Sequence, residues 1–489
     1  MIADELKYRI LQSLGHPPTA EQEQGAGTFA QMMCDGYSRV AMILRGSAGT
    51  GKTTLAAAIV RAMMSLRQKI VLLAPTGRAA KVLSLNAGMA AYTIHRRIYR
   101  QKMAGDMSAF NLNVNLQGDT LFVIDEASMI SLSASSSGDG SVFGSGCLLD
   151  DLVQYVYGAD NNCRMLLIGD RAQLPPVGEE ESGALTAAVI RAYGLTVYEA
   201  DLSEVLRQSR ESGILYNATV IRQMMARDGA TQLPRIRFRT FPDIVAVPGD
   251  ELIESLATSY SRVGQDDTIV VTRSNKRANI FNQGIRRTVI DREEELCRGD
   301  RLMIVKNNYY WTAASLSPEE QRGEAHGQSR LSFLANGDVA AVQRIRRVHE
   351  QYGFRFAEVT LQFPDYDDYE LTATVLLDTL TSESPSLTRE QQQQLYDRVM
   401  EDYADIPLKK DRLAKLRQDR YYNALQVKFA YAVTCHKAQG GQWAHVYVDQ
   451  GYMTDDMLTP DYMHWLYTAF TRATERLFLV NWPQAQVEA

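Results

Sequence analysis

The stretch GSAGTGKTT, Gly46 to Thr54, decides the fold of this chain. It follows the apolar run VAMIL at 40–44 and precedes LAAAIVRAMMSL, which has apolar residues at helical spacing. A glycine-rich loop between a strand and a helix can direct its backbone N–H groups at an anion, at the positive end of the helix. Lys52 would then reach the β- and γ-phosphates of a nucleotide, and the Thr53 hydroxyl would hold Mg²⁺. The stretch therefore predicts a nucleoside triphosphate site.

Two further strand ends carry polar residues suited to the same site. The strand in LFVIDEASMI, 121–130, ends in Asp125 and Glu126. We expect Asp125 to hold Mg²⁺ and Glu126 to polarise the water that attacks the γ-phosphate. A strand that ends in a solvated acidic pair is the ordinary alternative, and the phosphate loop upstream argues against it. Gln173, which follows the strand ending in Gly169-Asp170, could sense the γ-phosphate or be an ordinary loop residue.

Length and composition bound the class of protein. The chain has 489 residues, too many for one core, so we expect two or more domains. Its hydrophobic content is 45%, and no apolar run reaches the length of a membrane span. The five cysteines are scattered and indicate neither a disulfide framework nor a zinc site. We expect a cytoplasmic protein; the net charge of −6 does not decide its partner.

Alternating strands and helices indicate an α/β fold that starts again near Thr268. Within the second half, 306–424 shows short alternating strands, an Asn-Gly turn signal and charged helices, which predict a small β-barrel with added helices. The Ser/Gly-rich stretch 131–147 indicates a flexible loop without chemistry. The basic segment PRIRFRTF, 234–241, is interpreted as a strand, and so is FAYAV, 429–433.

Several residues have both an ordinary and a functional interpretation. Gln22 could complete a capping box with Thr19 or read the adenine edge. His95 and its basic neighbours could be a solvated helix face or a phosphate contact. Arg472 could form a surface ion pair or act as an arginine finger. Phe110 could be a core residue or an exposed stacking residue.

The order of the motifs resembles that of superfamily 1 helicases, specifically the RecD-like branch that also includes the Dda and Pif-type enzymes. The resemblance covers about 19–480 and is weakest over 300–424. It is carried by GSAGTGKT, APTGRAAK, TIHR, VIDEASMI, IGDRAQLPPVG, TCHKAQG and YTAFTRA. It implies two RecA-like domains with an ATP cleft between them and single-stranded DNA across their top.

The resemblance also assigns roles to individual residues. It implies catalytic roles for Lys52, Asp125, Glu126, Gln173, Arg207 and Arg472, with Mg²⁺ held by Thr53 and Asp125. It implies ATP contacts by Gln22, Gly46, Ser47, Ala48, Gly49, Thr50, Gly51, Lys52, Thr53, Thr54 and Gly440. It implies DNA contacts by Pro75, Thr76, Arg78, Thr93, His95, Arg96, Phe110, Asn275, Thr434, His436 and Lys437. One departure is Gln442, where relatives often carry Glu, so a polar contact near the nucleotide is expected to differ.

The expected domain organisation follows from the same resemblance. It comprises a helix at 1–18, a first RecA-like domain at 19–97 and 120–206, a pin-bearing insert at 98–119, a second RecA-like domain at 207–305 and 425–489, and an SH3-like insert at 306–424. The implied partners are single-stranded DNA and its junctions with duplex, together with single-strand-binding or repair proteins. A monomer without membrane contact is expected.

The predicted activity is ATP-driven movement along one DNA strand, which the resemblance places in the 5′-to-3′ direction and couples to duplex unwinding. Two other activities stay open: a translocase that displaces proteins without separating strands, and a nucleic-acid-binding switch gated by ATP. An RNA substrate also stays open, because phosphate and stacking contacts do not distinguish the sugars.

Overall fold

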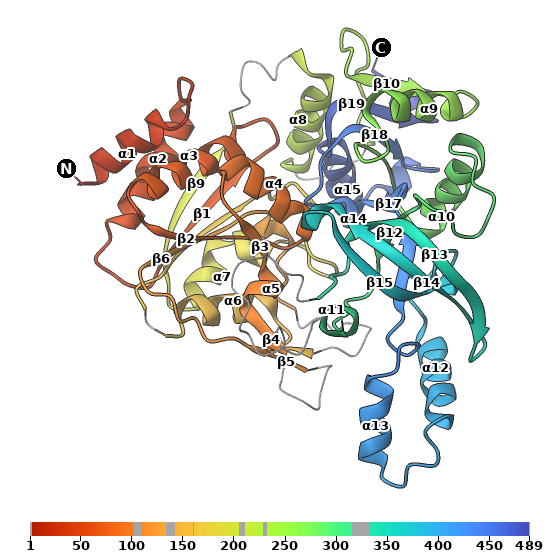
Figure 1. Ribbon diagram of the computed structural model, residues 1–489. Coiled ribbons are helices and arrows are strands. Elements are labelled where there is room, and N and C mark those ends of the chain that lie inside the picture. The colour runs from red at the N-terminus through yellow and green to blue at the C-terminus, as the bar shows by residue number, and fades with distance from the viewer. Residues whose placement is uncertain are drawn as a thin grey trace.

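The computed structural model consists of two parallel α/β domains, a closed β-barrel and a projecting pair of helices (Figure 1). No described helix is long and apolar enough to cross a membrane. The residues that the structure describes are 2–101, 109–133, 142–159, 161–204, 211–227, 232–314 and 333–488.

The first α/β domain is built on a six-stranded parallel sheet in the order β3-β2-β6-β8-β1-β9. Its strands are β1 (Val40–Gly46), β2 (Lys69–Ala74), β3 (Ala91–Thr93), β6 (Thr120–Ile124), β8 (Arg164–Gly169) and β9 (Thr196–Leu202). Its helices are α1 (Ile2–Gln12), α2 (Ala20–Met33), α3 (Lys52–Ser65), α4 (Gly77–Ala87), α5 (Ile94–Ile98), α6 (Leu148–Tyr157) and α7 (Ala187–Ala192).

The sequence of β1 explains why this sheet is covered on both faces. Successive side chains of a strand point to opposite faces, and every residue of β1 is buried. Met42 and Leu44 pack with α1, α2 and α3, whereas Ala41 and Ile43 pack with α6 and α7. A continuous apolar run is therefore what a central parallel strand requires. The apolar run 40–44 predicted this strand correctly.

The second α/β domain has a parallel sheet in the order β10-β19-β18-β11-β17. Its strands are β10 (Ile244–Val247), β11 (Thr268–Thr272), β17 (Ala432–Thr434), β18 (Trp443–Asp449) and β19 (Ala473–Val480). Its helices are α8 (Gly213–Met225), α9 (Leu252–Val263), α10 (Asn275–Gly284), α14 (Cys435–Ala438) and α15 (Pro460–Phe470). Two α/β domains of this kind confirm the predicted fold class.

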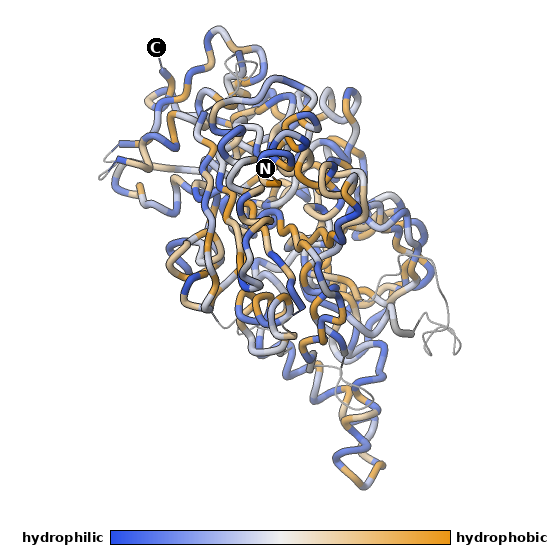
Figure 2. The backbone as a smooth tube through the Cα atoms, turned by 90° about the vertical axis from the view of Figure 1, so that its left-hand side faces the viewer, coloured by the Kyte–Doolittle hydropathy of each residue, from blue (hydrophilic) through white to orange (hydrophobic). Residues whose placement is uncertain are grey.

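The predicted barrel is present and closed. Its strands are β12 (Arg301–Ile304), β13 (Val339–Gln351), β14 (Phe354–Phe363), β15 (Tyr369–Leu376) and β16 (Leu425–Phe429). The short helix α11 (Tyr310–Ala314) follows β12, and the charged helices predicted over 387–422 are α12 (Arg389–Glu401) and α13 (Lys409–Arg417). These two helices form a hairpin that projects from the body (Figures 1 and 2).

The barrel extends beyond the expected block 306–424 on both sides, because β12 and β16 pair with each other and with its other strands. The predicted strand FAYAV is accordingly split between two sheets. Phe429 ends β16 in the barrel, and Ala432 begins β17 in the second domain. The Asn282 side chain accepts from the backbone N–H groups of Tyr431 and Ala432 at this break. A buried amide therefore satisfies backbone groups that a continuous strand would have paired.

A small three-stranded sheet stands beside the first domain. It contains β4 (Tyr99–Gln101), β5 (Ala109–Leu112) and β7 (Val142–Phe143), with β4 antiparallel and β7 parallel to β5. The hairpin falls in the stretch 98–119, where an insert was expected. The interpretation of 131–147 as loop alone was wrong, because its one Val-Phe pair forms β7. The Phe143 ring packs against His95 and Tyr99.

The segment 234–241 is not the strand that its sequence suggested. Ile236 makes only an isolated bridge to Val487, and the strand of this region is β10 instead. The Asn217 side chain accepts from Arg237 N–H at 2.9 Å and donates to Arg237 C=O at 2.9 Å. These side-chain hydrogen bonds take the place of those that a neighbouring strand would make. The alternation of basic and other residues in 234–241 therefore does not correspond to a paired β-strand.

Candidate nucleotide and nucleic-acid sites

The loop between β1 and α3 has the backbone conformation that an anion cradle needs. Gly49 and Gly51 have φ angles of 77°, in the left-handed region that glycine adopts without a Cβ clash. A Cβ at Gly46 would lie 2.9 Å from Thr50 Oγ1, so this position also needs glycine. Helix α3 begins at Lys52, which places the loop at the positive end of a 14-residue helix. The segment therefore has the backbone conformation of the predicted phosphate loop.

The phosphate loop lines a cavity of about 340 Å³ that both α/β domains enclose. The first domain contributes the loop and the polar ends of β6 and β8, and the second contributes the start of α8 and the residues that follow α15. The lining residues are Ser47, Ala48, Gly49, Gly51, Lys52, Thr53, Thr54, Asp125, Glu126, Asp170, Gln173, Ile214, Leu215, Gln442, Thr471, Arg472 and Ala473.

Asp125 and Glu126 lie where β6 ends and face the phosphate loop. Burial and the neighbouring Glu126 charge raise the pKa of Asp125 to about 6, while Lys52 opposes the rise. Glu126 has a φ of 50°, and its N–H donates to Asp125 Oδ1 at 2.9 Å. Two adjacent carboxylates in a buried site repel each other, so a nearby cation would stabilise them. The oxygen donors and their mutual repulsion therefore fit a divalent cation.

Gln173 joins the acidic pair to an arginine of the second domain. In the amide orientation that satisfies both of its ends, Gln173 Nε2 donates to Glu126 Oε2 at 3.2 Å and its oxygen accepts from Arg472 Nη2 at 3.2 Å. Arg472 is buried, and its guanidinium also donates to the carbonyls of Thr468 and Gly441. A surface ion pair is therefore wrong for Arg472, which reaches the cavity from the opposite domain.

Tyr467 of α15 makes a second link across the cavity. Its hydroxyl accepts from the Ala48 N–H of the phosphate loop at 2.9 Å and donates to Asp170 Oδ2 at 2.6 Å. From α8 of the same domain, Arg222 Nη1 donates to Ser47 Oγ at 2.5 Å. The phosphate loop therefore contacts two helices of the second domain directly.

Four described residues with predicted nucleotide contacts do not line the cavity, and a fifth lies outside the described residues. Two of the four, Gly46 and Thr50, belong to the loop itself. Gln22 is fully buried and completes the capping box with Thr19, and its Nε2 donates to Thr50 C=O at 3.4 Å. Gly440, with a φ of 71°, packs against Thr76 and Ala79 of α4 rather than the cavity. Arg207 lies in 205–210, outside the described residues. The adenine role of Gln22 stays a prediction.

A second cavity, of about 640 Å³, gathers several of the predicted DNA contacts. Pro75, Thr93, His95 and His436 line it, from the ends of β2 and β3, from α5 and from α14. Both α/β domains therefore contribute to it, as does the barrel side of the molecule through Asn307 and Asn336. We refer to this cavity as the interdomain groove.

His95 is a neutral aromatic in this groove rather than a cation. Burial lowers its pKa to about 4, and its ring packs edge-on against Phe143 at 5.3 Å. The interpretation of His95 as part of a solvated face is wrong, since its ring is partly buried against Tyr99 and Phe143. It offers a stacking surface and a hydrogen-bonding nitrogen to whatever enters the groove.

Arg78 and Arg96 are engaged with protein groups. Arg78 donates to Gln442 C=O at 2.8 Å and lies over the Trp443 ring at 4.2 Å, so it joins the two domains. Arg96 lies over Tyr92 at 5.9 Å. Burial lowers the pKa of both guanidinium groups. Their predicted DNA contacts stay predictions.

Lys437 is the strongest phosphate candidate beside the groove. Its Nζ is buried and has no hydrogen-bond partner among the described residues. Burial, reinforced by Lys428, lowers its pKa to about 8. A buried ammonium without a partner is costly, and an anion would relieve that cost.

The remaining predicted DNA contacts sit at helix starts or beyond the described side chains. Thr76, Thr93 and Thr434 are the N-cap residues of α4, α5 and α14. Asn275 is the first residue of α10, after its N-cap Ser274. The side chain of Phe110 lies outside the described residues, so its stacking role stays a prediction.

Sequence reasoning missed the residues that hold the two domains together. Tyr467 and Thr468 lie in YTAFTRA, five and four residues before Arg472, and Leu174 N–H donates to Thr468 Oγ1 at 2.8 Å. Their spacing from Arg472, which lies just past the end of α15, was the available signal. Ile214, Leu215 and Arg222 of α8 gave no such signal, because nothing local ties that helix to the phosphate loop.

Two parallel α/β domains that share a phosphate loop, an acidic pair and an opposing arginine define a P-loop NTPase of the two-domain RecA-like type. Two family models match parts of the chain. The "AAA domain" model matches 21–137, and the "UvrD-like helicase C-terminal domain" model matches 429–480.

Similar proteins of known sequence also include helicases. The chain is 24% identical over 500 residues to the uncharacterized protein R530 of Acanthamoeba polyphaga mimivirus, covering 89% of this chain and 94% of that protein. It is 30% identical over 177 residues to the ATP-dependent RecD2 DNA helicase of Deinococcus radiodurans, covering 36% and 21%. It is 25% identical over 350 residues to the ATP-dependent DNA helicase dda of Enterobacteria phage T4, covering 67% and 70%. Together, these matches support the resemblance to superfamily 1 helicases.

Proposed function

We propose that this chain is an ATP-dependent DNA helicase, which hydrolyses ATP between its two α/β domains and moves along single-stranded DNA held in the interdomain groove. The observation that carries the proposal is the bridge from Glu126 through Gln173 to Arg472. It joins the residue placed to activate water to a cation supplied by the other domain. The rate of hydrolysis at such a site therefore depends on the relative position of the two domains.

The chemistry of the proposed reaction is carried by six side chains. Lys52 holds the β- and γ-phosphates, and Glu126 orients the attacking water and accepts its proton. Gln173 positions Glu126, and Arg472 neutralises charge that develops on the γ-phosphate. Thr53 and Asp125 fit a Mg²⁺ site, because both line the cavity and Asp125 has an elevated pKa that a cation would lower. Mg²⁺ held by these two residues would supply positive charge against the phosphates of the nucleotide.

Coupling to movement follows from the same contacts. ATP draws Arg472 and the phosphate loop together, and product release removes the charge that they share. The interdomain groove is lined by both domains, so its shape changes when they move. Lys437, His95 and the N-caps of α4, α5 and α14 are proposed to hold the strand. The 5′-to-3′ direction rests on the resemblance described above.

The two curated helicases support this proposal by their names, RecD2 DNA helicase and DNA helicase dda. We further propose the adenine contact by Gln22, the second arginine finger at Arg207, stacking by Phe110, and action at single-strand–duplex junctions as a monomer, alone or beside single-strand-binding and repair proteins. A location in the cytoplasm completes the proposal. The domain limits stated from the sequence are proposed with the barrel widened to 301–429.

The first test is steady-state ATP hydrolysis with and without oligothymidylate, with Lys52→Ala as the inactive control. We expect strong stimulation by the oligonucleotide, lost in the variant. An ATP turnover rate that neither DNA nor RNA changes would contradict the proposal. The ATP-gated switch would then be the remaining hypothesis. A duplex with one single-stranded tail then separates a helicase from a translocase, because only a helicase releases the second strand.

A further inference from the structure

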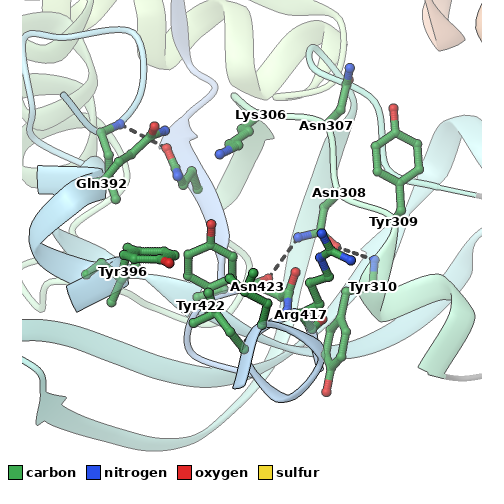
Figure 3. Close-up of a pocket in the computed structure, with 16 residues that line it drawn as sticks. Lys306, Asn307, Asn308, Tyr309, Tyr310, Gln392, Tyr396, Arg417, Tyr422 and Asn423 are labelled. Carbon is green, nitrogen blue, oxygen red and sulfur yellow. Dashed lines mark hydrogen bonds between the residues drawn. The ribbon is translucent and has the colours of Figure 1, made fainter. Parts of the chain in front are cut away.

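A third cavity, of about 300 Å³, lies between the barrel and the α12–α13 hairpin (Figure 3). It shares no lining residue with the nucleotide cavity, so ATP chemistry does not explain it. Its polar and aromatic lining includes Lys306, Tyr310, Gln392, Tyr396, Arg417 and Tyr422. Figure 3 shows Lys306 pointing into the space that Tyr396 and Tyr422 border. We refer to this cavity as the hairpin pocket.

Aromatic faces are available in the hairpin pocket. The rings of Tyr396 and Tyr422 lie 6.3 Å apart at an interplanar angle of 67°. Tyr422 is 38% exposed although it is a large side chain at a packed junction. Tyrosine faces of this kind stack with nucleobases, whatever the base.

The pocket also holds an amide group that lacks a partner. Gln392 Nε2 is buried, and no described group accepts a hydrogen bond from it. Buried amide groups are usually paired, so an unpaired one in a cavity wall indicates a ligand acceptor. The carbonyl oxygen of a nucleobase is an acceptor of this kind.

Two basic side chains line the same pocket, Lys306 and Arg417. Arg417 belongs to α13, which carries five basic side chains and a single acidic one, Asp411. The chain as a whole has a net charge of −6, so this helix departs from the composition of the molecule. Clustered basic residues beside aromatic faces favour a phosphate backbone over an uncharged ligand.

The hairpin pocket adjoins the interdomain groove through one short segment. Asn307 lines both cavities. Tyr309, which lines the pocket, stacks on Phe333 at 4.9 Å and lies 6.0 Å from Phe143, and both phenylalanines line the groove. A strand that leaves the groove beside Asn307 would therefore pass directly to the pocket wall.

We propose that the hairpin pocket binds one nucleotide of the single strand that leaves the interdomain groove. The base lies against Tyr422 and Tyr396 and accepts from Gln392, and its phosphate faces Lys306 and Arg417. The barrel and the hairpin would then extend the strand-binding track beyond the two α/β domains. This inference rests on the proposed function, because the strand must occupy the groove first.

The test combines photo-crosslinking with affinity measurements. Oligothymidylates that carry one 5-iododeoxyuridine at successive positions are crosslinked to the full chain, and the modified peptides are identified by mass spectrometry. Anisotropy of labelled oligothymidylates of increasing length is measured for the wild type, Tyr422→Ala and Tyr422→Phe. Tyr37→Ala is the matched control, because Tyr37 is 72% exposed on the first domain.

We expect one terminal iodouracil position to crosslink within residues 387–426. Tyr422→Ala should weaken binding about tenfold, but only for oligonucleotides long enough to reach the pocket. Tyr422→Phe, which keeps the ring, and Tyr37→Ala should bind as the wild type does. DNA-stimulated ATP hydrolysis in Tyr422→Ala establishes that the variant is folded and tests the proposed function separately.

Two results would overturn the inference. Crosslinks confined to groove residues, with equal affinities for Tyr422→Ala and wild type at every length, would leave the pocket without a strand. If excess thymidine monophosphate abolished the pocket crosslink but left the affinity for long oligonucleotides unchanged, the pocket would be assigned to a free nucleotide. Absence of any DNA binding by the wild type would instead reject the proposed function.

Discussion

Glu126 lies between a buried carboxylate and an amide, in the position from which a side chain can act on water. Its neighbour Asp125 is suited to bind a cation, and the Gln173 amide donates to Glu126 Oε2. Glu126→Gln keeps the shape of the side chain but removes the acceptor of the proton. We expect ATP to bind with unchanged affinity and hydrolysis to fall at least about 100-fold. Stopped-flow nucleotide binding and steady-state turnover check the two parts.

The control for this prediction is Glu180→Gln, which removes an exposed carboxylate outside the nucleotide cavity. It should leave both affinity and turnover unchanged. Substantial steady-state hydrolysis in Glu126→Gln would show that another group activates the water.

Lys437 gives the proposed strand binding a pH dependence. Burial lowers its pKa to about 8, so the ammonium is protonated below that pH and loses its charge above it. Phosphate binding favours the protonated form, so affinity falls as pH rises. We expect oligothymidylate affinity to drop about tenfold between pH 7 and pH 9, because the charged fraction falls by that factor. Anisotropy titrations at fixed salt measure it.

Lys437→Arg is the matched variant, because a guanidinium stays protonated over the whole range. Its affinity should be flat with pH. Lys437→Gln should bind weakly at both pH values and reduce the slope against salt by about 0.7, the share of one phosphate contact. A pH dependence that persists in Lys437→Gln would assign the titration to another group.

At the scale of residues, the sequence predicted which side chains line the nucleotide cavity better than it predicted which atoms contact one another. Lys52, Thr53, Asp125, Glu126 and Gln173 all line one cavity, as the motif spacing implied. Short motifs fix such residues because each follows a strand of one parallel sheet. Which atoms pair across the two domains depends on their relative position, and no local pattern encodes that position.

At the scale of elements, Gly440 shows how α14 and α4 approach each other. Its φ is 71°, and a Cβ there would lie 3.0 Å from Ala79 Cβ and 3.1 Å from Thr76 Oγ1. Gly440→Ala should therefore both strain the backbone and push α4 away from the second domain. We expect a lower Tm and a loss of DNA-stimulated turnover.

Gly88→Ala separates the two effects. Gly88 ends α4 with the same φ of 71°, but its Cβ would meet nothing within 4 Å. Both variants bear the left-handed strain, about 1–2 kcal/mol. Only Gly440→Ala adds the contact between domains, so only it should lose DNA-stimulated turnover. Equal turnover in the two variants would mean that the spacing of α4 and α14 does not matter to function.

The elements themselves were predictable where a continuous apolar run decided them. The run 40–44 and LFVI at 121–124 are buried on both faces, and both are strands as predicted. PRIRFRTF and FAYAV failed because the Asn217 and Asn282 side chains occupy backbone groups there. Such side-chain bonds come from distant elements, so alternation in a short window cannot reveal them.

At the scale of the whole molecule, the two α/β domains are joined through the phosphate loop itself. The Ala48 N–H, which an incoming phosphate needs, donates to the Tyr467 hydroxyl of the second domain. The same hydroxyl donates to Asp170, so one group connects the loop, the strand end of β8 and helix α15. Nucleotide binding must compete with this bond, and that competition couples ATP to domain position.

Tyr467→Phe removes the hydroxyl and tests this coupling. The net value of one such hydrogen bond is about 1 kcal/mol, so the KM for ATP should fall about fivefold when the competitor is absent. DNA stimulation should shrink at the same time, because α15 no longer senses the phosphate loop. Tyr462→Phe is the matched control: it lies on the same helix and loses a buried bond to Gln450 Oε1, away from the cavity. If both variants change KM equally, the effect belongs to the packing of α15, and the link through Ala48 carries no signal between the domains.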